Sequence, residues 1–204
     1  MLHIPVKTPA QQKTALPLAS VLLKAGEVIV VPSESSYGLA CDARNKKALA
    51  KLFALKERDK SKPPLVIVAT VDQAIRLVHF SPTARAFYKR YAKQVVSMRF
   101  DVKKENLPDW PYDSLVVCET HIPFCKNLSL LSDVSYTSTS ANKSEQPAAY
   151  SYRAFIAQFP DSEMQPAAFF DAGVLPQRPA STIVDLTTTP FTVLRQGSFE
   201  LPAL

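Results

Sequence analysis

Glycine, histidine and cysteine are scarce in this chain of 204 residues, and their scarcity excludes several kinds of site. Only four glycines are present, and neither GxGxxG nor GxxxxGK followed by Ser or Thr occurs, so a Rossmann loop and a P-loop are both excluded. The cysteines, Cys41, Cys118 and Cys125, are an odd number without CxxC spacing, which argues against a disulfide framework and a zinc site. With only three histidines, no metal site is expected.

Long apolar runs are also missing. Residues 2–31 lack a basic segment followed by an apolar one, and no run approaches the roughly 20 apolar residues that a membrane-spanning helix needs. We therefore expect a cytoplasmic protein without membrane contact. No GxSxG nucleophile elbow occurs, and His121 stands as a candidate base outside any recognisable triad, so a covalent mechanism is not expected.

The remaining composition is that of an ordinary globular protein. Hydrophobic residues make up 47% of the chain and charged residues 21%, which argues against disorder. A chain of 204 residues fits one sizeable domain, and we expect residues 1–204 to form it.

Hydrophobic periodicity predicts an α/β fold, a mixed sheet with helices packed on it. Helical spacing occurs at residues 14–25, 46–56, 71–79 and 82–92. Runs typical of strands occur at residues 26–32, 63–70, 115–120, 134–140, 167–173, 181–187 and 191–197. The first two strands flank helix 46–56, which predicts a βαβ unit with parallel pairing between them. No element is predicted between Val95 and Pro111.

Positive charge is concentrated in one segment. The chain has a net charge of +6, and the segment from Asp42 to Lys62 alone holds eight basic residues against three acidic ones. Such a patch attracts phosphates over a long range, which favours a nucleotide or RNA partner. A solvated helix face is the other interpretation.

Lys56 and Arg58 close helix 46–56 and form the most informative pair of this segment. A lysine supplies a point charge and an arginine a planar fork, and together they can bind phosphate or acyl oxygens and neutralise charge that develops during displacement at phosphorus. Charge placement at a helix end would explain the same pair without a ligand.

Hydroxyl-rich loops supply the other candidate contacts. Ser33 and Ser35 follow a buried strand and precede Tyr37, so this loop can line a cleft at the strand end, or it can be an ordinary loop with Tyr37 packed beneath it. Ser140 and Asn142 are two residues apart and can face one ligand, or they can form a turn. Ser181 and Arg195 add a hydroxyl and a cation, with a capping loop and a surface arginine as the alternatives.

Five separated motifs resemble, in order and spacing, the YrdC/Sua5 family of L-threonylcarbamoyladenylate synthases: PSESSYGL, LFALKER with KPPL, TSTSAN, ASTIVDL and VLRQG. The resemblance implies a YrdC-like twisted sheet, parallel and antiparallel, enclosing a deep basic cavity. It implies a nucleotidyltransferase that condenses L-threonine, bicarbonate and ATP into L-threonylcarbamoyl-AMP and releases pyrophosphate, with Mg²⁺ neutralising the leaving group. The product would feed threonylcarbamoylation of tRNA through downstream transfer machinery. The chain is expected to be the short, single-domain form.

The resemblance also implies roles for individual residues. Lys56 and Arg58 fall on the catalytic K-x-R positions. The nucleotide-binding positions are Ser140, Asn142, Ser181 and Arg195. The substrate-binding positions are Ser33 and Ser35, which replace two threonines of the family, together with Tyr37.

Several positions depart from the family pattern. Ile67 stands where a histidine is common, the central glycine-proline-threonine motif is not recognised between Val95 and Trp110, and the arginine of the vRxP motif is absent from CETHIP. Asp59 replaces a proline, and Glu145 replaces the Ser-Gly that usually follows TSAN. These changes fall mainly on the threonine side, so we expect weaker use of L-threonine than in a typical member.

Two rival functions stay open. The basic run and the altered positions permit a catalytically impaired paralogue that acts as a nucleotide- or RNA-binding module. Carbamoyl-adenylate chemistry of the hydrogenase-maturation kind normally comes with an added carbamoyltransferase domain, for which 204 residues leave no room.

Overall fold

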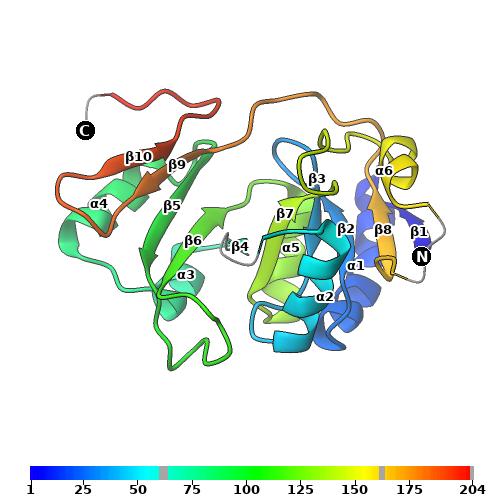
Figure 1. Cartoon of the computed structure of the whole chain (residues 1–204), viewed down its shortest axis with the longest axis horizontal. Helices are drawn as coiled ribbons and strands as arrows, with labels where there is room; N and C mark the ends of the chain where they lie inside the picture. Colours follow the sequence, from blue (N-terminus) through cyan, green and yellow to red (C-terminus); the bar gives the residue numbers. More distant parts are fainter. Residues whose placement is uncertain (60–63, 161–163, 203–204) are drawn as a thin grey trace.

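The computed structural model describes residues 1–59, 64–160 and 164–202, and within them ten strands form one mixed sheet (Figure 1). The strands are β1 (Leu2–Pro5), β2 (Ile29–Pro32), β3 (Tyr37–Ala40), β4 (Leu65–Val68), β5 (Val96–Asp101), β6 (Ser114–Glu119), β7 (Tyr136–Ser140), β8 (Ala168–Asp171), β9 (Thr182–Asp185) and β10 (Thr192–Arg195). The helices of this described part are α1 (Pro9–Lys24), α2 (Lys46–Lys56), α3 (Val71–Leu77), α4 (Pro82–Tyr91), α5 (Pro123–Ser132) and α6 (Tyr152–Gln158).

The strand order is β1-β8-β2-β3-β7-β4-β6-β5-β9-β10. The pairs β1 with β8, β2 with β8, β4 with β6 and β5 with β9 are parallel, and the other neighbours are antiparallel. The mixed sheet flanked by helices that the sequence predicted is therefore confirmed. No helix in the described residues is long and apolar enough to cross a membrane.

The predicted parallel pairing of β2 with β4 is wrong. β3, in a segment predicted to be a loop, turns back along β2, and both β3 and β7 lie between β2 and β4. The reversal occurs at Ser33–Ser36, where the Ser33 backbone N–H and its Oγ both donate to the Ser36 carbonyl, at 2.9 and 2.7 Å. This turn lacks the Asn-Gly or Asp-Gly pair that marks most tight hairpins in a sequence.

The start of α1 carries a local sequence signal, a capping box, that hydrophobic spacing does not detect. Thr8 caps the helix, since its Oγ1 accepts from the Gln11 N–H at 3.3 Å while Gln11 Oε1 accepts from the Thr8 N–H at 3.1 Å. This capping box starts the helix at Pro9, ahead of the predicted start at residue 14.

Four elements were not predicted from the sequence, namely β1, β5, α5 and α6. β5 lies in the stretch between Val95 and Pro111, for which no element was expected.

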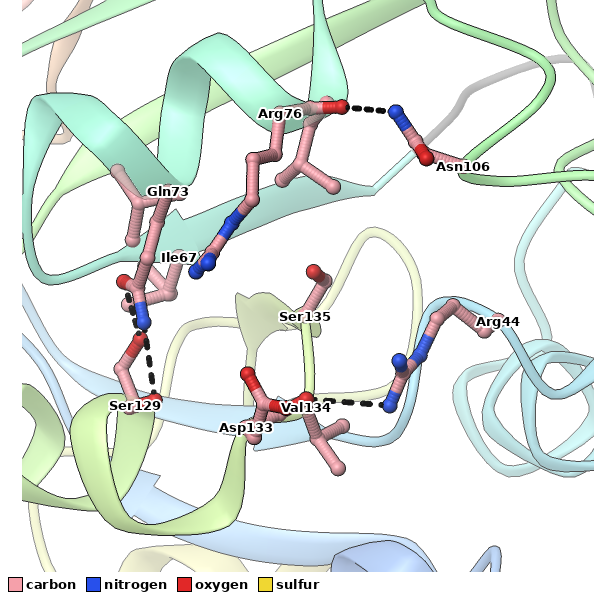
Figure 2. Close-up of a pocket in the computed structure, with 11 residues that line it drawn as sticks. Arg44, Ile67, Gln73, Arg76, Asn106, Ser129, Asp133, Val134 and Ser135 are labelled. Atoms are coloured by element: carbon pink, nitrogen blue, oxygen red, sulfur yellow. Dashed lines mark hydrogen bonds between the residues drawn. The ribbon is translucent and has the colours of Figure 1, made fainter.

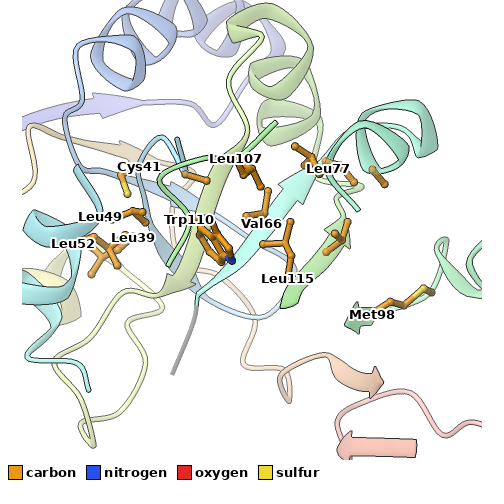
Figure 3. Close-up of a cluster of buried hydrophobic side chains, with 14 of the residues drawn as sticks. Leu39, Cys41, Leu49, Leu52, Val66, Leu77, Met98, Leu107, Trp110 and Leu115 are labelled. Carbon is orange, nitrogen blue, oxygen red and sulfur yellow. The ribbon is translucent and has the colours of Figure 1, made fainter. Parts of the chain in front are cut away.

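Two hydrophobic clusters lie on opposite faces of the sheet. Helices α2, α3, α4 and α6 contribute to the larger cluster, and α1 and α5 to the smaller one. Figure 3 shows part of the larger cluster, which contains Leu52 of α2, Val66 of β4 and the buried Trp110. Side chains alternate along β4, so Val66 enters the larger cluster and Ile67 the smaller one.

The smaller cluster ends at Ile67, Cys118 and Tyr136, and an open part of the same sheet face begins there. Leu65, Val116 and Ser138 lie two residues away from these three on the same strands and on the same face of the sheet. They line a cavity. The cavity therefore occupies the area of the sheet that α1 and α5 leave uncovered.

Gly38 of β3 allows β3 to pack closely against the side chains of β7. A Cβ at this position would lie 2.4 Å from Ser138 Oγ on neighbouring β7. We expect Gly38→Ala to lower the free energy of unfolding by about 1–3 kcal/mol, as overpacked cores do, measured by urea denaturation. Adding Ser138→Ala removes the clashing oxygen and should restore most of the loss. A double variant no more stable than Gly38→Ala would contradict this cause.

Candidate functional site

The candidate site is a cavity of about 220 Å³ on the open part of the sheet. Its lining comes from the turn between β2 and β3, from the end of α2, and from strands β4, β6, β7, β9 and β10 with adjacent loops. Six of the predicted site residues line it: Ser33, Ser35, Arg58, Ser140, Ser181 and Arg195. Segments far apart in the sequence thus supply one polar surface.

The positive charge of the cavity comes from Arg58 and Arg195. Arg58 Nη1 donates to Thr139 Oγ1 at 3.2 Å. Arg195 donates from Nε and Nη2 to the Ser181 carbonyl, at 3.1 and 2.8 Å. Burial lowers the pKa of both guanidinium groups from the ordinary arginine value, but an arginine remains charged at neutral pH. The cavity therefore offers two planar donors suited to phosphate or carboxylate oxygens.

Lys56 is not a lining residue of this cavity, although it belongs to the predicted K-x-R pair. Its side chain is 3% exposed, and Nζ donates to the Ser140 carbonyl at 2.6 Å and to Ser140 Oγ at 3.2 Å. Nζ also donates to the Asn142 carbonyl at 3.1 Å and to Asn142 Oδ1 at 2.8 Å. Lys56 thus joins the end of α2 to the end of β7 and fixes the S-x-N segment beside the cavity.

Asn142 is likewise buried and engaged within the protein. Its Nδ2 donates to the carbonyls of Lys143 and Gln146, at 2.7 and 2.5 Å, while Oδ1 accepts from Lys56. Of the S-x-N pair, the structure therefore places Ser140 at the cavity wall and Asn142 behind it. Direct contact of Lys56 or Asn142 with a ligand stays a prediction.

Tyr37 lies beneath the serine turn and does not line the cavity. Its ring is fully buried, and its hydroxyl donates toward the Gly173 carbonyl at 2.7 Å and Asp171 Oδ1 at 3.1 Å. Burial, with the Asp171 carboxylate as a second cause, raises the pKa of this phenol well above its ordinary value. These contacts give Tyr37 a packing role, and its contact with a substrate stays a prediction.

The STI and VLRQG motifs pack against each other and form the wall of the cavity that contains Ser181 and Arg195. A Cβ on Gly197 would lie 2.1 Å from the Ala180 carbonyl oxygen, so only glycine allows this approach. The Gly197 N–H donates to Thr182 Oγ1 at 3.0 Å, and the Ser198 N–H donates to the Ala180 carbonyl at 3.1 Å. This close approach sets Ser181 and Arg195 at the cavity.

Comparison with known proteins assigns the family. The model of the Sua5_yciO_yrdC family, described as telomere recombination, matches residues 21–197. The chain belongs to this family. A threonylcarbamoyl-AMP synthase of Thiobacillus denitrificans is 32% identical over 197 residues, which cover 90% of this chain and 97% of the relative.

Two solved structures show the same fold. The P. abyssi Sua5 structure in complex with L-threonine superposes with a TM-score of 0.82 at 22% identity, covering 96% of this chain and 57% of the Sua5 chain. The chain therefore spans little more than half of that Sua5. E. coli YciO also has a TM-score of 0.82, at 20% identity, covering 98% of this chain and 96% of YciO.

The Sua5/YrdC fold also brings in residues that the sequence analysis missed. Ser97, on the unpredicted strand β5, lies 2.8 Å from Ser181 through their hydroxyls. Glu34 ties the serine turn to the segment after β6, since Oε1 accepts from Thr120 Oγ1 at 2.7 Å and from the His121 N–H at 2.9 Å. A carboxylate flanked by cavity serines is visible in PSESS, but its partner 86 residues away is not.

Other predicted features lie away from the cavity. His121, considered as a base, is not among the lining residues, and its Nε2 lies 3.0 Å from the Ala92 carbonyl. Ile67, which stands in place of the family's histidine, is 4% exposed and packs in the smaller cluster. Within the described residues no group of three or more His, Cys, Asp or Glu side chains could hold a metal ion, and the cavity lining includes no carboxylate.

The titration of Lys56 is open to measurement. Burial, with the positive charge of Arg58 as a second cause, lowers its pKa from 10.5 to about 8. Between these values the unfolded chain binds more protons than the folded one, so the stability contributed by this group rises with pH across that window. We expect the difference in unfolding free energy between the wild type and Lys56→Met to rise between pH 8 and 9.5, by at most about 1.4 kcal/mol per unit, in urea titrations.

Lys47→Met on the exposed side of α2 is the control, and its difference from the wild type should not change over this range. A flat difference for Lys56→Met as well would show that the four oxygens around Nζ hold the ammonium at an ordinary lysine pKa.

Proposed function

We propose that this protein is a threonylcarbamoyl-AMP synthase that uses L-threonine, bicarbonate and ATP. The observation that carries the proposal is the cavity itself, in which Arg58 and Arg195 face a wall of serine hydroxyls in a Sua5/YrdC fold. Relatives named for this activity are about as long as this chain, and the Sua5 complex with L-threonine supports an amino-acid subsite in the fold.

The reaction needs two bonds to form. The threonine amine attacks bicarbonate carbon and water leaves, which produces a carbamate. A carbamate oxygen then attacks the α-phosphorus of ATP, and pyrophosphate leaves with the bonding electrons. Both steps bring anions together, so positioned cations accelerate them by neutralising charge in the transition state and by holding the reactants in line.

The lining residues divide into three groups for these tasks. Arg58 would bind the carbamate and the α-phosphate, and Arg195 with Ser181 would bind phosphate or ribose oxygens on the far wall. Ser35 would donate to the amino-acid substrate from the opposite turn, and Ser33, whose hydroxyl hydrogen is bonded to the Ser36 carbonyl, would accept from it. Lys56 acts in this scheme through Ser140, whose carbonyl and hydroxyl it holds in place.

Mg²⁺ is not matched by the protein side chains of this cavity. The ion prefers oxygen ligands and usually takes one or two carboxylates in addition to phosphates, but the cavity lining has none. Mg²⁺ would therefore arrive with the phosphates of ATP, and no step above is assigned to it. Bicarbonate, delivery of the product to tRNA and the downstream transfer machinery are part of the same proposal.

Alanine variants of the two cavity arginines test whether ATP binds in this cavity. We expect Arg58→Ala and Arg195→Ala each to weaken ATP binding by about 1.5–3 kcal/mol, the range of a hydrogen bond to a charged group, measured by calorimetry. Arg153→Ala on α6, an exposed arginine outside the cavity, is the matched control and should bind ATP like the wild type. Wild-type affinity in both cavity variants would disprove the shared ATP site.

Pyrophosphate release gives the test of the reaction. The protein is incubated with ATP, bicarbonate and each amino acid in turn, and we expect release to depend on bicarbonate and to be largest with L-threonine. Because Ile67 and the CETHIP segment lack the family's polar residues, the KM for L-threonine should exceed that of the Thiobacillus denitrificans relative measured alongside. Release that is independent of any amino acid would contradict the proposed activity.

A further inference from the structure

A second, larger hollow of about 550 Å³ lies outside the candidate site, and it is basic. It lies where β4 and β6 end, between α4 and the beginning of α5. β4 and β6 are parallel neighbours, and the crevice outside the carboxyl ends of parallel strands is where ligands bind in open α/β sheets. None of its lining residues lines the candidate site.

The charge of this groove is strongly one-sided. Its cations are Arg85, Lys89, Lys93 and Lys126, and the one carboxylate in its lining, Glu119, accepts a hydrogen bond from the Tyr88 hydroxyl at 2.8 Å. Among the ion pairs found in the described residues, none includes any of the four cations. This excess of positive charge is therefore available to an anionic ligand.

The cations also form a row. Arg85 and Lys89 are four residues apart on α4, and Lys93 follows four residues later, just beyond the helix end. Residues at this spacing lie on one face about 6 Å apart. A row of cations matches a chain of repeated phosphates better than one isolated anion.

The cavity in Figure 2 shows the contrast. It is also lined by two arginines, Arg44 and Arg76, but Asp133 is part of the same lining. Arg44 is further paired with Asp42, Nε to Oδ1 at 3.4 Å. The positive and negative charges in and around that cavity largely balance, so it lacks the excess of positive charge found in the groove.

The basic run from Asp42 to Lys62, for which a nucleotide or RNA partner and a solvated helix face were the two interpretations, is used in part within the protein. Lys51 is paired with Glu27, Lys56 is buried, and Arg58 faces the candidate site. Lys60 and Lys62 lie outside the described residues. Lys46 and Lys47 are the exposed lysines of α2 itself.

We propose that the groove between α4 and α5 binds the phosphate backbone of an RNA strand. Protein–protein interfaces place aromatic and large apolar side chains at their core. The lining here has one aromatic residue, Tyr88, whose hydroxyl is bonded to Glu119, and its other apolar residues are the small Ala69, Val71 and Ala92. Interfaces with nucleic acids are much more positively charged than interfaces between proteins, and this groove has four cations against one carboxylate. An acidic protein is the alternative occupant, and the experiment below separates the two.

The groove lies one short segment away from the candidate site. Glu119 lines the groove, and the next two residues, Thr120 and His121, are held by Glu34 of the serine turn. Because the two linings share no residue, RNA and ATP should bind independently.

The test is binding of a labelled, unmodified tRNA transcript, measured by fluorescence anisotropy over a salt series without ATP. Lys89→Glu/Lys93→Glu reverses two groove lysines, and Lys46→Glu/Lys47→Glu is a control with the same charge change on exposed lysines of α2. We expect the groove variant to lose about tenfold or more in affinity at low salt and the control to stay near the wild type. The slope of log K against log salt should become shallower by about 0.7–0.9 for each phosphate that the variant no longer neutralises.

The milder Lys89→Gln/Lys93→Gln should give an intermediate loss, which covers the case in which the reversed variant folds poorly. ATP affinity should be the same in all variants, so the result does not depend on the proposed synthase activity. Equal losses in the groove variant and the control, or no tRNA binding by the wild type at low salt, would overturn the proposal. Displacement of the transcript by poly-L-glutamate at equal charge would overturn the choice of RNA over an acidic protein.

Discussion

The contact between the Lys56 ammonium and the S-x-N segment organises the central part of the molecule. Four oxygens of Ser140 and Asn142 surround Nζ, so the end of α2 and the end of β7 cannot separate without leaving buried polar atoms unpaired. Unpaired groups of this kind typically destabilise a protein by about 1–3 kcal/mol each. Arg58, two residues further on, is thereby directed to Thr139 and the cavity.

The two faces of the sheet explain the positions of the candidate site and of the proposed groove. α1 and α5 cover one part of a face with the smaller cluster, and the cavity occupies the part that no helix covers. The proposed RNA groove uses a different edge, at the carboxyl ends of β4 and β6. Small-molecule chemistry and polyanion binding can therefore occupy separate surfaces of one sheet, joined by the Glu34 contact.

Much of the candidate site could be predicted from short polar motifs. Arg58, Ser140, Ser181 and Arg195 were found because each stands beside a readable helix or strand, and the structure brings them to one cavity. Lys56 and Asn142 carry the same motif signal, but they bond to each other. A motif identifies which residues matter without indicating whether they face the ligand or support a neighbour, since that depends on the end of a second element.

The sequence by itself determined the mixed α/β class, the family and the type of those elements that have a readable pattern, because hydrophobic periodicity and motif order are local properties of the chain. It did not determine strand pairing: β3 escaped detection because its turn is built from serines, and β5 was not recognised in a stretch without a readable pattern. Only the tertiary structure decided which cations remain available to bind an anionic ligand. Lys51, Lys56 and Lys89 look alike in the sequence, but one is paired, one is buried and one faces an open groove. The reason is physical, since the ionic partner of a lysine lies in space and not beside it in the chain.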